Sequence, residues 1–572
     1  MTQNKNNSDI VIIGGVAAGP KTAAVLARRL ADKKITLFQK EEHISYGTCG
    51  MPYFASGDIN SFEELTFTSY GIPRTPEFFL RSKGFEVMTA SEVIKIDRKQ
   101  KTVTVKNLKD GAVLEHGYGK LVIATGSVPN RPPFECADSP NIRSFTRPGD
   151  AIHFRQAAQT GQVGKVVIIG GGFIGCELVE AMVSMWGIET VLIEKEPQVL
   201  PYILDPEMAE LVKHEMVKQE VAVITGAAVE KVTLDADGNP VVAVKDRKPI
   251  TADYVFVCVG VHPETALAKE CGLAIGKAGG IEVNDYMQTS DPDIYAGGDC
   301  VELKHQLTGK KVFMPMGSLA NRHGRVIAEN IVGNKIKFPG VVGSFLVKVF
   351  DINVGTTGLS ERAALSLGMK AVTLCGSFPD KPDYYPDIKT ITVKIVYDED
   401  NEKLLGLQAV GAGDICRRVD VVASFLQRKA GIEDLLDFEP GYAPPYAEAL
   451  DPLYHLAAMA AARKRGISFL KPGLDIDNFM EHNDFSNVIG LDVREPDEIE
   501  AQPWTLPEKF DGQLVTIPLN DLKERLGELD RSKKILLMCR RGPRSYQAAH
   551  ILRQAGFDDV HIVSGGAQAS RL

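Results

Sequence analysis

Short apolar runs alternate with helical patterns through the first third of the chain. Ile10–Ile13 leads through a glycine-rich turn into the helical pattern of residues 21–34, and a second apolar run follows at Ile35–Phe38. The same unit returns later, with apolar runs at Lys165–Ile169 and Glu189–Ile193. Strand, tight turn, helix and strand in this order begin a doubly wound parallel sheet. The pattern therefore predicts two separate dinucleotide-binding (Rossmann-like) folds.

The pattern changes near residue 340. Alternating strands at Thr390–Asp398 and Leu404–Gly411, followed by helices, predict an α+β domain. Residues 463–473 are basic and end in Pro and Gly, which is typical of a linker. Fresh apolar runs at 487–493 and 534–539, with helical stretches between them, predict a small α/β domain at the end of the chain.

Composition narrows the class of protein without naming a function. The 572 residues are 44% hydrophobic and 24% charged, with a net charge of -9, which is typical of a globular protein of several domains and argues against a nucleic-acid partner. No apolar run approaches the ~20 residues that cross a bilayer, and the first residues lack a secretory apolar region. The nine cysteines are scattered and form no CxxC pair, so we expect no metal site and a cytoplasmic, non-membrane protein.

The second glycine-rich turn carries the full dinucleotide fingerprint. Gly170 permits the tight turn, Gly172 lets a pyrophosphate approach the backbone, and Gly175 allows close helix packing. The following strand ends in Glu194, whose carboxylate can bond a ribose 2′-hydroxyl and would repel a 2′-phosphate. This turn is predicted to bind NADH in preference to NADPH.

The first turn is less regular. Gly14, Gly15 and Gly19 are present, but Val16 stands at the middle fingerprint position and Gln39 replaces the expected acid. Gln39 can still bond a ribose hydroxyl, although it lacks the charge. The turn alone therefore indicates a nucleotide site only weakly.

Two later segments strengthen the assignment of the first site. Residues 121–129 (LVIATGSVP) contain Thr125 and Gly126, and residues 289–300 (TSDPDIYAGGDC) place Asp299 after a strand and a Gly-Gly turn. A carboxylate there can bond a ribityl hydroxyl while helix-terminal N–H groups face phosphate.

These four elements, in this order, resemble the flavoprotein disulfide reductases, which carry FAD in the first fold and NAD(P)H in the second. The resemblance implies further cofactor contacts at Val93, Gly260, Ala320 and Asn321. It also implies an FAD domain at 1–155 and 280–335, an NAD(H) domain at 156–279, a dimerisation domain at 336–460, a linker at 461–476 and a last domain at 477–572.

Cys49 is a solitary thiol in the segment ISYGTCGMPYF, with no second cysteine close behind it. Its sulfur must therefore cycle with an outside partner, as a mixed disulfide, as a persulfide, or as a sulfenic acid. The pattern S-x-x-x-C-G-x-P-Y is similar to that of the coenzyme A-disulfide reductases and their persulfide-reducing relatives, which implies substrate contacts at Ser45 and Thr48. The peroxidase members tend to have a histidine where this chain has Ala17, which disfavours peroxide reduction.

The same resemblance implies a shared active site in a homodimer. It places Tyr442, and one of Tyr384 and Tyr385, near the partner's cysteine as proton donors. Coenzyme A itself is less clearly implied, because the chain has Val25 and Leu26 where the coenzyme A-specific members commonly have a basic residue.

Cys539 is the second cysteine in an unusual context, because it ends an apolar run and opens the loop CRRGPR. Together with LDVREPDE upstream and SGG downstream, this resembles a rhodanese domain, whose loop N–H groups form an anion-binding nest. Such a nest would stabilise a thiolate and hold a sulfane sulfur. Arg544 would order the loop, and Arg540 and Arg541 would add positive potential.

The sequence thus predicts an FAD-dependent NADH:persulfide or polysulfide reductase, or a coenzyme A disulfide reductase, with a sulfur-carrying rhodanese domain. The substrate would be a small persulfide, polysulfide or disulfide. The alternatives are an NADH oxidase or peroxidase that cycles Cys49 through sulfenic acid, and a redox-sensing flavoprotein with little turnover.

Overall fold

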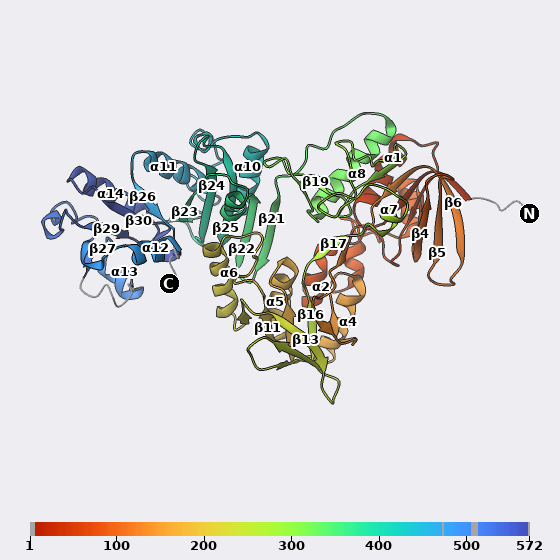
Figure 1. Ribbon diagram of the computed structural model, residues 1–572, viewed down its shortest axis with the longest axis horizontal. Helices are drawn as coiled ribbons and strands as arrows, with labels where there is room; N and C mark the ends of the chain where they lie inside the picture. Colours follow the sequence, from red (N-terminus) through yellow and green to blue (C-terminus); the bar gives the residue numbers. More distant parts are fainter. Residues whose placement is uncertain (1–5, 472–473, 505–512, 570–572) are drawn as a thin grey trace, which may run out of the picture. The chain divides into compact units, whose positions relative to one another are not determined.

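The computed structural model describes residues 6–471, 474–504 and 513–569. The chain forms two compact units (Figure 1). Unit 1 comprises Met1–Pro197 and Val221–Val341, and unit 2 comprises Gln198–Glu220 and Val342–Leu572. No helix within the described ranges is both long and apolar enough to span a membrane.

The first sheet of unit 1 has the strand order β3-β2-β1-β6-β5-β4, with β18 paired to β6. Its strands are β1 (Asn6–Ile13), β2 (Ile35–Phe38), β3 (Glu86–Met88), β4 (Ser91–Asp97), β5 (Thr102–Asn107), β6 (Val113–Ile123) and β18 (Ile294–Ala296). β1 pairs in parallel with both β2 and β6, so their carboxyl ends lie at one edge. The helix α1 (Ala18–Arg29) follows β1 and packs along α8 (Gly317–Val332), as Figure 1 shows.

The second sheet of unit 1 has the order β12-β11-β10-β16-β9, and every pairing in it is parallel. Its strands are β9 (Ile142–Arg143), β10 (Lys165–Ile169), β11 (Glu189–Ile193), β12 (Ala222–Ile224) and β16 (Tyr254–Val257). The two strands predicted here have the predicted bounds, and α5 (Phe173–Trp186) joins them. The prediction of two nucleotide-binding folds is confirmed.

Smaller elements complete unit 1. They are α2 (Met51–Ser56), α3 (Pro76–Phe78), α4 (Pro148–Gln159), α7 (Ala266–Glu270), β7 (Ser127–Pro129), β8 (Glu135–Cys136), β13 (Val229–Leu234), β14 (Pro240–Val244), β15 (Ile250–Thr251), β17 (Val261–Pro263), β19 (Leu303–Lys304) and β20 (Lys311–Val312). Strands β15, β14, β13 and β8 form a separate small sheet in that order. Apolar side chains of β13 and β14 pack with those of β10 and β11 in one core, so the small sheet covers the nucleotide-binding sheet.

Unit 2 contains an antiparallel sheet with the order β21-β22-β25-β24-β23. Its strands are β21 (Ser344–Val349), β22 (Ile352–Gly358), β23 (Ala371–Pro379), β24 (Thr390–Asp398) and β25 (Leu404–Gly411). The helices α6 (Pro206–Lys218), α9 (Glu361–Ser366), α10 (Cys416–Gln427) and α11 (Pro452–Lys464) contact it. The predicted α+β character of this region is confirmed.

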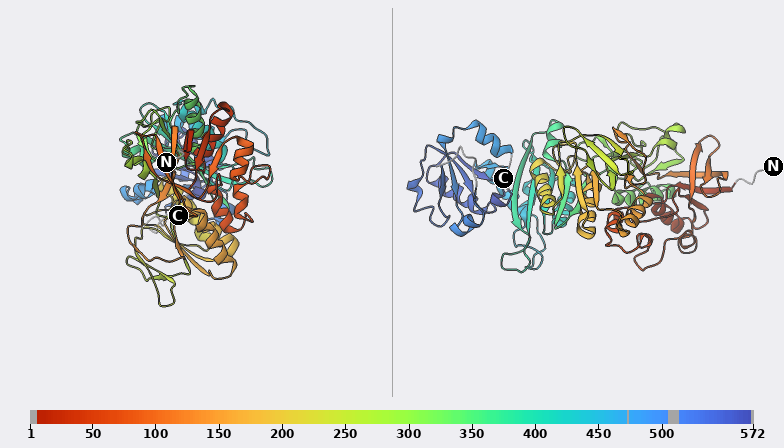
Figure 2. Two further views of the ribbon diagram at one scale, coloured as in Figure 1. Left: turned by 90° about the vertical axis from the view of Figure 1, so that its right-hand side faces the viewer. Right: turned by 90° about the horizontal axis from the view of Figure 1, so that it is seen from below.

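The C-terminal sheet of unit 2 is parallel, with the order β26-β30-β29-β27-β28. Its strands are β26 (Ser468–Leu470), β27 (Val488–Asp492), β28 (Leu514–Thr516), β29 (Lys534–Met538) and β30 (Val560–Val563), and its helices are α12 (Leu474–His482), α13 (Pro496–Ala501), α14 (Pro543–Gln554) and α15 (Gly566–Ala569). Apolar side chains of α14 and of α12 lie in separate cores against β29, so helices cover both faces (Figure 2).

The expected linker at 461–476 contains regular structure. α11 runs into it, and β26 pairs with β30, so three of its residues are an edge strand of the C-terminal sheet. Pro472 and Gly473, which were expected to close the linker, lie outside the described residues.

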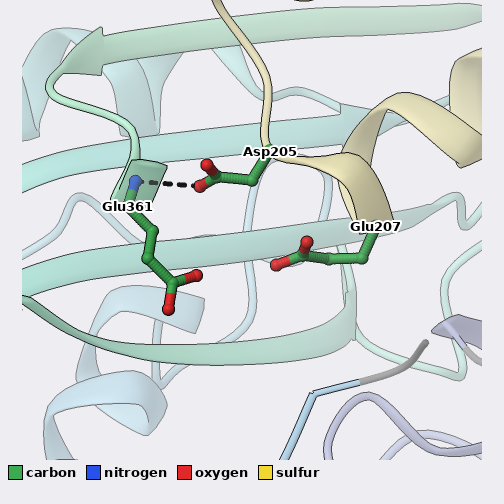
Figure 3. Close-up of side chains that lie close together, drawn as sticks. All are labelled: Asp205, Glu207 and Glu361. Carbon is green, nitrogen blue, oxygen red and sulfur yellow. Dashed lines mark hydrogen bonds between the residues drawn. The ribbon is translucent and has the colours of Figure 1, made fainter. Parts of the chain in front are cut away.

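A buried charge cluster joins α6 to the antiparallel sheet of unit 2 (Figure 3). Asp205, Glu207 and Glu361 bring carboxylate oxygens within 4.8 Å of one another, which is a geometry that could hold a metal ion. Lys394 supplies the cation instead. Its ammonium group is fully buried, bonds to Glu207, and lies 2.8 Å from both Asp205 and Glu361, while Lys471 adds a second ammonium 2.6 Å from Glu361.

Candidate active site

The first glycine turn forms a tight cradle at the end of β1. Gly14 has a φ of +107°, and a Cβ there would lie 2.0 Å from the carbonyl oxygen of Ala124. A Cβ on Gly19 would lie 1.9 Å from the oxygen of Gly14, so α1 can approach the turn only because this residue is glycine. Gln39 Oε1 accepts a hydrogen bond from Gly15 N–H at 2.8 Å.

The neighbouring strand ends bring the other predicted FAD residues to this cradle. Thr125 directly follows Ala124, and Gly126 has a φ of +77°. Ser127 donates to Asp299 at 3.2 Å, and burial raises the pKa of this carboxyl. Ala320 is packed 3.9 Å from the Cβ position of Gly298, next to Asp299.

The residues of this cradle fit FAD: a tight glycine turn at the start of a helix, where N–H groups can face phosphate, and a buried carboxylate that can bond a hydroxyl. Two predicted contacts lie elsewhere. Val93 is buried in β4, and Asn321 lies on the exposed side of α8. Their roles as FAD contacts stay predictions.

The second turn repeats the first with an acid in place of the amide. Glu194 Oε2 accepts from Gly171 N–H at 2.6 Å, just as Gln39 does for Gly15. A Cβ on Gly172 would meet no atom within 4 Å, so this glycine borders open space where a pyrophosphate can approach.

The remaining glycines of the second site are sterically required. A Cβ on Gly175 would lie 2.0 Å from the oxygen of Gly170, whose own φ is +110°. Gly260, with a φ of +93°, lies in the loop after β16, at the same sheet edge. This arrangement fits a nicotinamide dinucleotide.

Cys49 lies in the 3-10 turn Thr48–Gly50, which leads directly into α2. Ser45 N–H bonds to the oxygen of Gly15 at 2.7 Å, so the segment that carries Cys49 is fastened to the first glycine turn. Thr48 begins the turn. Nearby, Gly50 leaves no room for a side chain, because a Cβ there would lie 2.4 Å from Leu65.

α2 packs against α5 of the second nucleotide-binding fold. Trp186 of α5 donates its indole N–H to the oxygen of Ala55 at 2.8 Å, and Arg155 of α4 donates to the oxygen of Phe54 at 2.6 Å. Helix α2 is thereby held by both folds, and Cys49 is placed between them.

The surroundings of Cys49 favour its neutral thiol. The residue as a whole is exposed, yet desolvation of its sulfur, followed by the carboxylates of Glu177 and Asp299, raises the pKa of the Cys49 thiol. The same Glu177, after desolvation, raises the pKa of Tyr53. Burial and the neighbouring Glu180 raise the pKa of Glu177 itself to about 7.

Glu177 is a site residue that the sequence analysis missed. It lies two residues after Gly175, the last glycine of the second fingerprint, so its position on α5 was available as a signal. A carboxyl that titrates near neutrality beside a thiol can hold or release a proton at working pH.

The predicted tyrosines all lie in unit 2, whereas Cys49 lies in unit 1. Tyr384 and Tyr385 occupy the loop between β23 and β24, and Tyr442 precedes α11. A hydrogen bond between Tyr384 and Tyr442 raises the pKa of Tyr384, so two of the three are brought together. Tyr384 is 74% exposed and Tyr442 50% exposed, and their role near a partner's cysteine stays a prediction.

The Cys539 loop is a backbone cradle at the carboxyl end of β29. Gly542 N–H points at Cys539 Sγ at 3.0 Å. Ala567 N–H bonds to the Cys539 oxygen at 2.9 Å, and a Cβ on Gly566 would lie 2.3 Å from that oxygen. One backbone N–H of the loop therefore reaches the sulfur, and the full anion-binding nest stays a prediction.

Two of the three arginines of this loop pair with carboxylates. Arg544 forms a bidentate ion pair with Glu498 at 2.6 and 2.7 Å, and its hydrogen bonds lower the pKa of Glu498 to about 2. Arg541 pairs with Asp383 of the antiparallel domain at 3.1 Å. Arg541, which was expected to add positive potential, is thus opposed by a carboxylate far away in the sequence, and its effect on the loop stays a prediction.

A basic surface lies along α1 and α8 in unit 1. Two adjoining hollows share Lys21 and Arg325. Their other cationic lining residues are Arg28, Arg29, Arg322 and Lys337. Val25 occupies a position where a basic residue was expected for a coenzyme A site. Its side chain is buried between the helices, and the cations lie on the outer face around it.

Comparison with known proteins agrees with this geometry. Residues 8–318 match the family described as pyridine nucleotide-disulphide oxidoreductase, and residues 344–454 match its dimerisation domain. The chain belongs to this family. Residues 476–570 match the rhodanese-like domain. The protein is thus a pyridine nucleotide-disulphide oxidoreductase with a C-terminal rhodanese-like domain, and its family implies FAD and NAD(P)H as cofactors.

This chain covers nearly the whole length of the individual relatives that it matches. A protein of Pyrococcus abyssi named NAD(P)H sulfur oxidoreductase (CoA-dependent) is 35% identical over 79% of this chain and 98% of its own. A protein of Methanocaldococcus jannaschii named NADH oxidase is 35% identical over the same shares. The solved structure of an NAD-dependent persulfide reductase from A. fulgidus has a TM-score of 0.91 at 35% identity, and covers 99% of this chain and 100% of its own.

Proposed function

We propose that this protein is an NADH-dependent reductase of persulfides, polysulfides or coenzyme A disulfide. The observation that carries the proposal is the solitary Cys49, held between two nucleotide cradles by α2 and unaccompanied by another cysteine before Cys136. Its substrate must bring the second sulfur. The A. fulgidus neighbour, which also aligns over the rhodanese-like domain, is named for persulfide reduction.

The chain's own residues support a two-step exchange. The Cys49 thiolate attacks the outer sulfur of a persulfide R–S–SH, the donor S–S bond breaks, and the thiol R–SH leaves. Two electrons and one proton then release the retained sulfur as HS⁻ and restore the thiolate. FAD held by the first glycine turn and Asp299 would supply these electrons, with NADH as their source. Glu177 can accept or donate a proton near Cys49, because its pKa lies near neutrality.

We further propose a homodimer in which Tyr442, with Tyr384 or Tyr385, reaches the partner's Cys49. Their exposure and the Tyr384–Tyr442 hydrogen bond support a pair poised to donate a proton to a leaving thiolate. Cys539 would carry sulfane sulfur in its N–H cradle.

Anaerobic NADH consumption with separate acceptors tests the function. Coenzyme A persulfide, polysulfide and coenzyme A disulfide should each be reduced much faster than peroxide. The oxidase alternative has support from the M. jannaschii relative's name, whereas Ala17 in place of a histidine disfavours peroxide chemistry. If peroxide, or O2 in a parallel aerobic assay, is much the best acceptor, the proposal is wrong. No turnover with any acceptor would indicate a redox sensor instead.

The carrier thiol proposed here is coenzyme A, because its phosphates match the basic surface of α1 and α8. That surface carries six cations, and two of them are partly neutralised: Arg29 by Glu329 at 3.1 Å and Lys337 by Asp285 at 3.8 Å. The name of the P. abyssi relative includes coenzyme A dependence, which supports the same carrier.

The double variant R28Q/R325Q should raise the KM for coenzyme A persulfide about tenfold, because two exposed charge–phosphate contacts of ~0.7 kcal/mol each are lost. Pantetheine persulfide, which lacks the nucleotide, should be used as before. K245Q/R247Q, on the exposed turn between β14 and β15, removes the same charge elsewhere in unit 1 and is the matched control. Equal losses with both substrates would contradict a coenzyme A site here.

Glu194 should set the nucleotide preference. Its carboxylate is buried at the end of β11 and would repel a 2′-phosphate, so we propose NADH as the reductant. E194Q should keep the bond to Gly171 N–H yet reduce the preference for NADH over NADPH about tenfold, or ~1.4 kcal/mol. The ratio of kcat/KM for the two nucleotides measures this. Q39E, which adds a charge at the other cradle, should leave the ratio unchanged.

A further inference from the structure

The mouth of the Cys539 cradle lies against the antiparallel domain of the same unit. Residues of α15, which follows the last strand of the C-terminal sheet, contact β23. Beyond β23, the loop that begins at Asp380 contains Asp383, which reaches Arg541 of the cysteine loop. A residue outside the rhodanese-like domain therefore takes part in the electrostatics of its cysteine loop.

Arg541 is held by this contact. Its side chain is 18% exposed, whereas that of Asp383 is 75% exposed. Its Nε is buried and has no hydrogen-bond partner among the described residues. Asp383 is thus the acceptor that fixes the guanidinium group at the cradle, and it does so from the solvent side.

A second carboxyl lies in the same place. Burial, followed by the charge of Asp383, raises the pKa of Glu448, while Arg541 acts in the opposite direction, so these three groups are mutual neighbours. With Glu498 on Arg544, three carboxyls surround a loop that contributes three arginines. The carboxyls therefore reduce the positive charge that the loop presents to an approaching donor.

We propose that Asp383 is a specificity-determining residue of the rhodanese-like domain, which selects sulfur donors that are uncharged near their sulfane end over inorganic dianions. The proposal rests on the sulfur-carrying role proposed above for Cys539. By neutralising Arg541, Asp383 removes the attraction that would concentrate a dianion such as thiosulfate at the cradle. The binding of an organic persulfide whose carrier is uncharged near the sulfur is not weakened by this neutralisation.

Both donors would react by the same sulfur transfer, so only their binding charge differs. With an organic persulfide, the Cys539 thiolate bonds to the outer sulfur, the donor S–S bond breaks, and R–SH leaves with the proton. With thiosulfate the same attack releases sulfite, and the two negative charges leave with it. Cyanide then removes the outer sulfur as thiocyanate and restores the thiolate.

The test uses the full-length flavoprotein and measures thiocyanate formation from thiosulfate and, separately, from pantetheine persulfide. At low ionic strength D383N should raise kcat/KM for thiosulfate about three- to tenfold, because one opposing charge at the mouth is removed. The rate with pantetheine persulfide should change less than about twofold, and the thiosulfate gain should shrink in 0.5 M salt.

Two further variants make the result decisive. D387N removes a charge from the same loop at a position whose φ of +60° suits asparagine, and it should leave both rates unchanged. D383N/R541Q should lose the thiosulfate gain, since that gain requires the freed arginine.

An unchanged thiosulfate rate in D383N, or equal gains with both donors, would overturn the proposal. If the wild-type protein forms no thiocyanate from either donor, the sulfur-carrying role itself fails and the proposal fails with it. NADH-dependent persulfide reduction, measured on the same preparations, reports separately on Cys49.

Discussion

C49S is expected to abolish NADH-dependent reduction of persulfide and disulfide, lowering kcat by about a thousandfold or more, because a serine hydroxyl cannot accept a sulfane sulfur at neutral pH. Only the step that passes electrons to the sulfur substrate should be lost. The glycine cradles, Gln39 and Glu194 are untouched, so NADH should still bleach the bound flavin's absorbance at close to the wild-type rate. Stopped-flow absorbance and anaerobic steady-state assays separate the two halves.

C539S is the matched control, because it makes the same substitution at the other predicted sulfur site. It should lose thiocyanate formation and keep NADH-dependent reduction of a soluble persulfide. If C49S retained full persulfide turnover, the proposed mechanism would be wrong even if the substrate is right. Loss of both activities in C539S would indicate instead that all sulfur passes through the rhodanese-like domain first.

K394M should be the most destabilising substitution considered, costing about 3–5 kcal/mol of the free energy of unfolding. Methionine fills much of the same volume but leaves Asp205, Glu207 and Glu361 with the ammonium of Lys471 alone. Lys394 is fully buried, so water cannot replace it. Urea unfolding of the full-length protein measures the change. K370M, which breaks the exposed pair with Asp400, is the control and should cost less than ~1 kcal/mol.

The pH dependence gives a second readout of this cluster. In the wild type, burial acts to raise the pKa of Asp205 and of Glu361. Lys394 opposes it, together with backbone N–H groups at Asp205 and with Lys471 at Glu361, and the pKa of each is lowered. Carboxyls with a lowered folded-state pKa stabilise the fold at neutral pH, and that contribution is lost as the pH falls through their folded pKa values. Without Lys394 the same carboxyls should be easier to protonate, so the deficit of K394M should shrink from pH 8 to pH 5. A deficit that is constant over this range would contradict the electrostatic explanation.

The strand and turn pattern predicted the nucleotide-binding folds because the glycines act locally. Gly170 and Gly175 are required by contacts within one strand–turn–helix unit, and the sequence alone contains that unit. The irregular first turn was resolved only by the structure. Gln39 bonds to Gly15 N–H just as Glu194 bonds to Gly171 N–H, so the amide preserves the acceptor that the turn requires.

The parts of the site that sequence did not predict depend on contacts between distant segments. Asp383 and Arg541 are 158 residues apart, and no local pattern indicates their pairing. Five of the six cations around Val25 come from two helices far apart in the chain, and their spacing at Lys21 and Arg28, and at Arg322 and Arg325, was the available signal. The role of Glu177 depends likewise on the packing of α2 against α5, which brings its carboxyl to Cys49.

The ion cluster at Lys394 also limits how this protein can be recombined with its relatives. Two of its three carboxylates come from Gln198–Glu220, a stretch that the chain inserts between β11 and β12 of the nucleotide-binding sheet yet that belongs to unit 2. A chimera that exchanged residues 156–279 as one cassette would import a foreign α6 and could leave Lys394 with Glu361 alone. The antiparallel sheet and α6 therefore form one unit for recombination. In a chimera that folds, both should come from the same parent protein.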